Sequence, residues 1–597
     1  MSLTRARSRM YSRGEQSKFL NSKGLLSRPP LLVGPEVRMT LRAIPTRILL
    51  LTMMAALSAP LLACHADEND PEGQAEELAD PVRRQNAIHN LQRIYSGVLA
   101  DNQGNRASEP VVAVANIITP ALTETYLNFP EDRTNGQAIL DLLKEVQDPR
   151  ALPALKKALE WRTGVTELHA VRAAQAIGGM TVPDGEKPAV AEALGRAFDQ
   201  ITGVREVDNQ MRVEFVRALG TLHHNSATPV LVRVMQSQSE NQNFLINRLA
   251  ARELGELGDP MAVEPMIGAL FQFAPNNPGM RMNDVAAEAL VRIGRPSLAP
   301  MLQVLTGGHQ AANTAADALI AAVVARQPGL TLNRAQVVGP EATTTLGMLG
   351  FPEAFDALLA ETRATEVDRK LNGCIALTRL NLSDAQHTQV RTVITELYNS
   401  LNARDVEMRA QLMATMANTF DPGYLPLFLT TARDQEVHPV LRETAIASLA
   451  KLANAAQAGE LRTIIAADSD NAARYNEHVG PYLTLATECD TNVSCYVGKL
   501  GDADAKVAEK AAYMIGLLAA DNDEASMTGL AAQLGNANFP VRFAALLALD
   551  HIAANGSQAG IDKIEELRSQ EEGRAIWNQF KPIALPIQAR LRARMPS

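Results

Sequence analysis

The sequence is poor in aromatic residues, which make up 4% of its 597 positions. Large β-sheets draw on aromatic and β-branched side chains, so this composition disfavours a sandwich or a barrel. Apolar residues nevertheless account for 46% of the chain, and long stretches are rich in Ala and Leu. Such residues favour closely packed helices. The composition therefore predicts an all-α protein, and the length predicts several domains or a repeat array.

The sequence also lacks the short motifs by which many enzymes and metal proteins are recognised. It contains no GxSxG elbow, no P-loop, no HExxH helix and no Cys-x-x-Cys-His haem site. Its ten histidines are scattered, and His223-His224 is the only adjacent pair. Met408, Met413 and Met416 share a helical segment, where methionine fills gaps between helices more often than it binds copper. We expect no catalytic residue, no metal and no cofactor, with a metal-handling protein or an enzyme on the same scaffold as the alternative.

Positive charge is scarce outside the N-terminal region. Residues 1–63 carry ten Lys or Arg and two acids, whereas the rest of the chain carries 47 bases against 64 acids. A surface this acidic repels phosphate backbones. We therefore expect no nucleic-acid partner.

The N-terminal region has the pattern of an export signal that starts at Met39. Arg42 and Arg47 precede a mainly apolar run over 48–57, which is too short for a comfortable transmembrane helix. The segment Leu61-Leu62-Ala63-Cys64 then resembles the lipobox of bacterial lipoprotein precursors, although Leu62 is larger than the residue usual there. This resemblance implies a lipid on Cys64 and a place in the bacterial cell envelope, facing the periplasm or the cell surface. An ordinary secretory signal with a coincidental cysteine is the alternative.

The rest of the chain repeats itself with a period near 35 residues. Leu254–Ala262 (LGELGDPMA) recurs as Leu346–Ala354 (LGMLGFPEA), and Leu290–Pro296 repeats the apolar-Gly-x-Pro ending 36 residues after the first copy. Near the C-terminus, Leu500–Asp504 returns as Leu534–Asn538, 34 residues later. Several matches at nearly one period indicate a repeat array.

Each repeat has the signals of a helical hairpin. Gly258 ends one helix cheaply, Asp259 caps the next, and Pro260 stands at its first position. Apolar residues then recur at helical spacing from Val263 to Leu270, so that one face of this helix is apolar. One hairpin cannot bury such a face alone, whereas a stack of hairpins can.

A second recurring element is an acid followed by an apolar–Arg pair and an Ala-rich helix. It occurs at Asp80–Arg83, from Asp405 to Arg409 and from Asp434 to Arg442. Together these features resemble HEAT repeats, especially the phycobilisome-lyase type. The resemblance covers residues 80–590 and implies an α-solenoid, a superhelix of about twelve to fourteen stacked helical hairpins. It implies no particular chemistry.

Two cysteines lie close together in a short polar segment. Cys489 and Cys495 could pair in an oxidising compartment and close a seven-residue ring, and a metal site is the less favoured alternative because Cys-x5-Cys is not a zinc spacing. Cys374 lies in an apolar helical pattern and is expected to be a small core residue.

These features predict the organisation and the role of the chain. The expected parts are an over-long start (1–38), a lipoprotein signal peptide (39–63), an acidic solvated tether (64–80), the solenoid (81–590) and a C-terminal tail (591–597). Arg590, Arg592 and Arg594 are expected to be exposed on a frayed final helix, and Glu571-Glu572 to face water. The segments Gln236–Asn243 and Phe273–Met280 lengthen turns. Such loops gather on one edge, where they contribute to binding or are simply tolerated surface insertions. We expect a membrane-anchored, non-catalytic scaffold or adaptor that binds a protein or peptide partner.

Overall fold

The recurring Leu-Gly segments are equivalent helix ends in the computed structural model, which describes residues 67–596. Helix α11 (Phe244–Leu257) ends at Gly258 with φ +64°, and α16 (Arg334–Leu349) ends at Gly350 with φ +73°. This left-handed backbone costs glycine little, because glycine has no Cβ. The prediction that these segments end successive helices is confirmed.

The first glycine of the same motif has a different role, which is close helix packing. A Cβ on Gly255 would lie 2.8 Å from the Cα of Ala289 on the neighbouring helix, and a Cβ on Gly347 would lie 2.8 Å from the Cα of Ala376. Two helix backbones can approach this closely only where no side chain separates them. The Leu-Gly-x-Leu-Gly motif therefore combines a packing glycine with a helix-ending glycine.

Aspartates at the turns cap the helices that follow. The side chain of Asp259 accepts a hydrogen bond from the backbone N–H of Met261 at 3.0 Å, and Asp148 and Asp421 cap equivalent turns. Each cap leads into a proline and a short 3-10 turn before the helix proper begins, so the predicted cap is confirmed with one extra turn.

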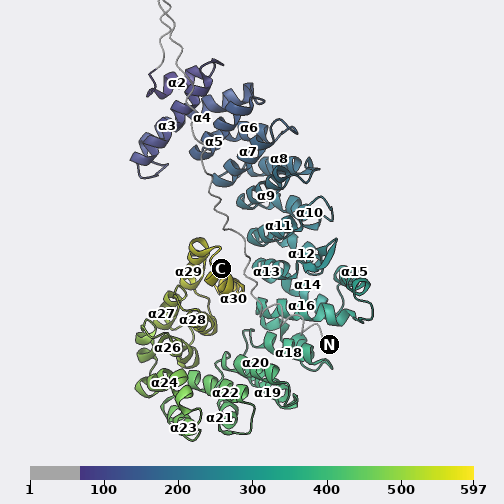
Figure 1. Ribbon diagram of the computed structural model, residues 1–597, viewed down its shortest axis with the longest axis vertical. Helices are drawn as coiled ribbons and strands as arrows, with labels where there is room; N and C mark the ends of the chain where they lie inside the picture. Colours follow the sequence, from purple (N-terminus) through teal and green to yellow (C-terminus); the bar gives the residue numbers. More distant parts are fainter. Residues whose placement is uncertain (1–66, 597) are drawn as a thin grey trace, which may run out of the picture. The chain divides into compact units, whose positions relative to one another are not determined.

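The helices belong to two alternating series, an inner series and an outer series (Figure 1). The inner series is α3 (Arg84–Asp101), α5 (Arg133–Val146), α7 (Glu167–Gly179), α9 (Glu206–Thr221), α11, α13 (Asn283–Ile293), α16, α18 (Val367–Leu377), α20 (Val406–Ala417), α22 (Pro439–Leu452), α24 (Ala472–Cys489), α26 (Ala505–Leu518), α28 (Phe539–Ile552) and α30 (Ala575–Arg594). The outer series is α2 (Pro71–Glu77), α4 (Glu109–Asn128), α6 (Leu152–Ala158), α8 (Lys187–Asp199), α10 (Thr228–Gln236), α12 (Val263–Ala269), α14 (Leu298–Leu305), α15 (Gln310–Arg326), α17 (Phe355–Glu361), α19 (Asp384–Ser400), α21 (Leu425–Arg433), α23 (Ala455–Ala466), α25 (Val493–Lys499), α27 (Glu524–Gln533) and α29 (Gln558–Glu571).

Successive inner helices pack on one another, most extensively α5 on α7, α7 on α9, α11 on α13 and α26 on α28. The core between the two series runs continuously through the stack and is built largely of buried Ala, Leu, Ile and Val. In the described residues the only sheet is a hairpin of β1 (Phe273–Ala274) and β2 (Asn277–Arg281). The fold is the expected all-α solenoid of stacked HEAT-like hairpins.

Both ends of the array differ from expectation. Within 64–80, the predicted tether, α2 is capped by Asp70 and packs on α3 and α4, and it buries Gln74 and Leu78. At the other end, residues 591–594 belong to α30 instead of a tail, and Leu591 is fully buried. Each segment is ordered because it covers the apolar surface of the hairpin beside it. The predicted start (1–38), signal peptide (39–63) and Cys64 lie outside the described residues.

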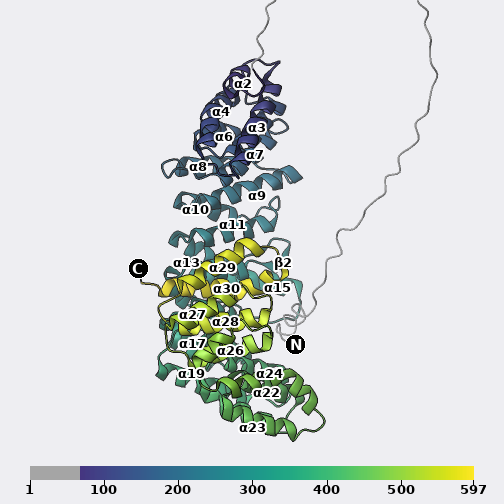
Figure 2. The ribbon, with the colours of Figure 1, turned by 90° about the vertical axis from the view of Figure 1, so that its left-hand side faces the viewer.

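The last inner helix returns to the middle of the array. Helix α30 packs on α28, as the stacking order requires, and it also contacts α13 and α16 (Figures 1 and 2). The inner helices from α13 to α30 therefore form a closed ring, while α3 to α11 form an arm that leads into it. Repeat arrays usually bring only neighbouring repeats into contact.

Candidate functional site

The segments that lead into α5, α7, α9, α11 and α13 lie along one edge of the arm and of the first ring helix, because these inner helices stack in sequence order (Figures 1 and 2). We call this the loop edge: residues 129–132, 159–166, 200–205, 237–243 and 270–282, with the first two residues of each helix that follows. Both predicted insertions, Gln236–Asn243 and Phe273–Met280, lie here, and the second forms the β1–β2 hairpin.

A row of exposed apolar side chains follows this edge, with one member at each inner helix. Between 41% and 61% of the surface of each residue is exposed, although large apolar side chains elsewhere in the arm are mostly buried. We call these residues the apolar row: Phe129, Leu168, Val204, Leu245 and Met280. Packed helices are about 8–10 Å apart, so the loops that carry these residues follow one another at about that interval. Apolar side chains that recur in this way on one edge indicate an interaction surface.

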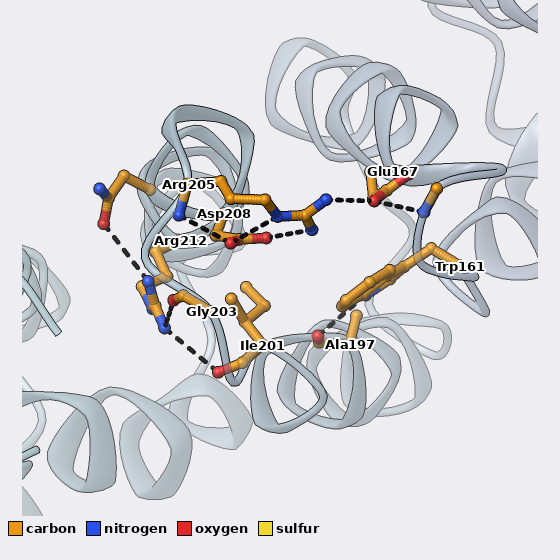
Figure 3. Close-up of polar contacts among 10 residues, drawn as sticks. Trp161, Glu167, Ala197, Ile201, Gly203, Arg205, Asp208 and Arg212 are labelled. Atoms are coloured by element: carbon orange, nitrogen blue, oxygen red, sulfur yellow. Dashed lines mark hydrogen bonds and ion pairs between the residues drawn. The ribbon is translucent and has the colours of Figure 1, made fainter. Parts of the chain in front are cut away.

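Ion pairs join successive segments of the loop edge, and Figure 3 shows those of Arg205. Arg205, at the start of α9, donates to Glu167 of the preceding repeat at 3.1 Å and to both carboxylate oxygens of Asp208, at 3.0 and 2.7 Å. Glu167 also accepts from the backbone N–H of Gly164 at 2.6 Å. The pair Arg248–Asp284 joins the next two repeats in the same way. These contacts fix the positions of adjacent loops and therefore the spacing of the apolar row.

Buried side chains also fix the same loops, by hydrogen bonds to their backbone carbonyl oxygens. Arg212 donates to the carbonyl oxygens of Ile201, at 3.2 Å, and Gly203, at 2.9 Å, and the indole N–H of Trp161 donates to the carbonyl oxygen of Ala197 at 3.1 Å (Figure 3). These bonds satisfy carbonyl groups that the ends of helices leave unpaired. The same use of an arginine recurs in other repeats, at Arg84, Arg442 and Arg542. Of the three apolar–Arg pairs recognised in the sequence, only the one at Arg442 has this role. In the first copy Arg84 takes the role instead of Arg83, and Arg409 lies over the ring of Tyr398.

The charged groups of the loop edge are held in their ionised forms. Hydrogen bonds from Arg205 lower the pKa of Asp208. Burial alone would raise the pKa of Glu167, but hydrogen bonds from the backbone and from Arg205 outweigh it and lower that pKa. A general base needs a pKa near the working pH, and both shifts move away from it. The chemistry of the edge therefore suits positioning and contact.

One histidine lies beneath the edge without access to solvent. His169 on α7 is fully buried, and its Nδ1 is 2.9 Å from the hydroxyl of Tyr126, while its Nε2 is 3.4 Å from the carbonyl oxygen of Arg133. The neutral ring with its proton on Nε2 satisfies both partners. Desolvation by burial lowers the pKa of His169. A Cβ on Gly136 would overlap this ring, so the glycine makes room for it.

A buried lysine performs a structural task in the ring. Lys510 on α26 is fully buried and donates to the carbonyl oxygens of Ala450, Lys451 and Ala453, at 2.9, 3.0 and 2.7 Å. Three donors on the ammonium group match three acceptors at the end of α22. Sequence reasoning missed this residue because nothing in the local pattern distinguishes it from a surface lysine.

The cysteines and methionines chosen from the sequence occupy structural positions. Cys489, the last residue of α24, and Cys495 in α25 form a disulfide with a Cα–Cα distance of 5.5 Å. Cys374 is a free, buried thiol whose pKa is raised to about 12 by burial, in agreement with a core role. Met413 and Met416 are fully buried in the core.

The histidines chosen from the sequence form no cluster. His224 accepts a hydrogen bond from the N–H of Ser226 and caps a turn, and His223 precedes it. Among residues 67–596, no group of three or more His, Cys, Asp or Glu side chains is arranged to hold a metal ion. In the same part of the chain, no helix combines the length and the apolar character that crossing a membrane requires.

Three charged groups near the C-terminus are less exposed than expected. Arg590 and Arg594 pair with Asp550, and Glu571 pairs with Arg542. Arg590 and Glu571 are both largely buried, and Arg594 is half-buried. They are buried because α28, α29 and α30 pack together and place opposite charges side by side, which the sequence spacing alone does not reveal. Arg592, on the outer side of the same helix, is exposed as expected.

Solved structures with a similar arrangement are helical solenoids. The karyopherin Kap121p, in a crystal structure with the extreme C-terminus of the protein phosphatase Cdc14p, is 12% identical over 87% of this chain and 75% of its own, with a TM-score of 0.41. Kap95p, in a structure that concerns RanGDP and nuclear import complex assembly, is 13% identical over 87% and 78% of the two chains, with a TM-score of 0.36. No protein-family model and no curated protein matches the sequence.

Proposed function

We propose that this chain is a non-catalytic protein-binding scaffold of the bacterial cell envelope, anchored through a lipid on Cys64. The observation that carries the binding role is the apolar row, which places one exposed apolar side chain at each of five successive inner helices. The lipobox-like segment Leu61–Cys64 supports the anchor.

The separation of the stacked inner helices that carry the row favours an extended segment of a protein partner. An extended chain rises about 3.3 Å per residue, so that three residues span about 10 Å, close to the separation of packed helices. A segment with an apolar side chain at every third residue would therefore meet successive members of the row. Burying the exposed half of one leucine contributes about 1 kcal/mol, and several such contacts add up to specific binding.

Crosslinking in envelope membranes tests the binding role. The full chain and the double variant Leu168→Asp/Leu245→Asp would be expressed in their native setting, crosslinked and purified, and the recovered partners quantified by mass spectrometry. We expect the double variant to recover its partner at least about tenfold less well, because two apolar contacts become charged and solvated. Val440→Asp is the matched control, since Val440 is 47% exposed but lies on α22, outside the row. Equal recovery by all three proteins would exclude the apolar row as the binding surface.

The anchor is tested separately. Cys64→Ser should remove incorporation of a labelled fatty acid and should move the protein from the membrane fraction to the soluble fraction. Retention of the label in this variant would refute lipidation at Cys64 and would leave the binding proposal unaffected.

A further inference from the structure

The ring closes through contacts between the C-terminal hairpin and the middle of the array. On one side, Arg568 of α29 donates two hydrogen bonds to Glu256 of α11, at 2.8 and 2.5 Å. Glu256 also pairs with Arg292 of α13 at 2.6 Å. One carboxylate therefore joins three helices: α11 of the arm, α13 of the ring and α29 of the C-terminal hairpin.

A second contact lies at the end of α16. Arg590 of α30 donates to the carbonyl oxygen of Met348 at 3.1 Å, and its side chain lies over Gly350 so closely that a Cβ there would overlap it. The carbonyl of Met348 is one of those that the helix end leaves without a backbone partner. Arg590 thus caps a helix about 240 residues earlier in the sequence.

We propose that α29 and α30 form a latch, which can release α11, α13 and α16 while every repeat keeps the contacts with its neighbours. In the closed state the latch covers the inner surface of α13 and α16, and in the open state that surface is accessible. Release needs no repeat to unfold, because the solenoid is held together by contacts between adjacent hairpins. The latch concerns a different surface from the apolar row, so it does not rest on the proposed function.

Hydrogen exchange of the full chain, measured by mass spectrometry, tests the latch with Arg568→Gln. We expect exchange in α13, α16 and α30 to rise about tenfold, which is the size of effect that losing hydrogen bonds to a charged group produces. Exchange in α5, α7 and α9 should not change, because these helices do not contact the latch. Arg592→Gln is the matched control, since Arg592 lies exposed on α30, the other helix of the latch, and it should behave as the unmodified chain.

Two further measurements distinguish release of the latch from a general loss of stability. Arg568→Lys keeps the charge and should restore most of the protection, and salt should raise exchange of the unmodified chain in the same three helices because it screens the ion pair. Small-angle X-ray scattering should show a larger maximum dimension for Arg568→Gln at unchanged helix content. Unchanged exchange in Arg568→Gln, or an equal rise in every helix, would overturn the proposal. If Arg568→Gln does not fold, the salt series and Arg568→Lys decide the question alone.

Discussion

Arg568 and Glu256 are separated by 312 residues in the sequence and meet through two hydrogen bonds. In an open repeat array, a substitution in one hairpin changes mainly the stability of that hairpin and of its neighbours. Here the pair makes the middle of the array and its C-terminal hairpin depend on each other. Substitutions near the closure should therefore have larger effects than the same substitutions at equivalent places in the arm.

Two helix-ending glycines allow this comparison directly. Gly258 and Gly350 both have left-handed backbone at equivalent helix ends, but a Cβ has free space at Gly258 and overlaps Arg590 at Gly350. Gly258→Ala should lower the free energy of unfolding by about 1–2 kcal/mol from backbone strain alone. Gly350→Ala should cost more, because Arg590 must also leave its place. Denaturant unfolding followed by circular dichroism measures both, and equal losses would show that the contact with Arg590 contributes nothing.

Replacing the buried lysine should be costly. Lys510→Met keeps the apolar stem but leaves three carbonyl groups at the end of α22 without their donor, and each buried unpaired group costs about 1–3 kcal/mol. We expect a loss of about 3 kcal/mol or more in denaturant unfolding, with increased hydrogen exchange in α22 and α26. Lys506→Met is the control on the same helix, because Lys506 contacts one carbonyl at an exposed position and its loss should be nearly neutral.

Much of the fold follows from local signals in the sequence. The glycine at the helix end, the capping aspartate and the proline after it each act over a few residues, so the pattern around Gly258 predicts the turn between two helices and its copies predict the array. Two members of the apolar row could have been found in the same way, because Leu168 and Leu245 are each the second residue of an inner helix, whereas Phe129, Val204 and Met280 precede theirs. This signal appears only after the repeats have been aligned.

The closure of the ring could not be predicted from such signals. It depends on small rotations between successive hairpins, which accumulate from α13 to α30, and no single residue encodes their sum. Arg590 and Glu571 were expected to face water for a different reason: the sequence spacing does not show that packing of α28, α29 and α30 places them beside opposite charges. Likewise α2 was assigned to a tether because its residues are polar, while its order comes from packing on α3 and α4.

The disulfide should contribute local stability between α24 and α25. Closing a seven-residue ring removes freedom from the unfolded chain and is worth about 2 kcal/mol on the chain-entropy account. Cys495→Ser should therefore lower the thermal midpoint, and a reductant should bring the unmodified protein to the same value. The reductant should leave the variant itself unchanged. A reductant that lowers both proteins equally would show that the stabilisation comes from another source.

Stability should fall as the pH drops from about 7 to 5, and His169 should account for part of the fall. Burial lowers the pKa of His169 in the folded protein, whereas in the unfolded chain the ring titrates near pH 6.5. Between these two values the unfolded state binds more protons, so that the free energy of unfolding decreases as the pH falls. Carboxylates with a lowered pKa, such as Asp208, change the free energy of unfolding only at more acidic pH, so they do not contribute between pH 7 and 5.

The variant His169→Gln tests this assignment, because glutamine does not titrate and keeps polar atoms near Tyr126. It should be less stable than the unmodified protein at pH 7.5, since the ring packs against Gly136, and its stability should decline less steeply between pH 7 and 5. His89→Gln, on an exposed position of α3, should reproduce the slope of the unmodified protein. Denaturant unfolding at several pH values gives the slopes. The same slope in His169→Gln and in the unmodified chain would mean that other groups carry the pH dependence, and His551, whose pKa burial also lowers, would be the next to replace.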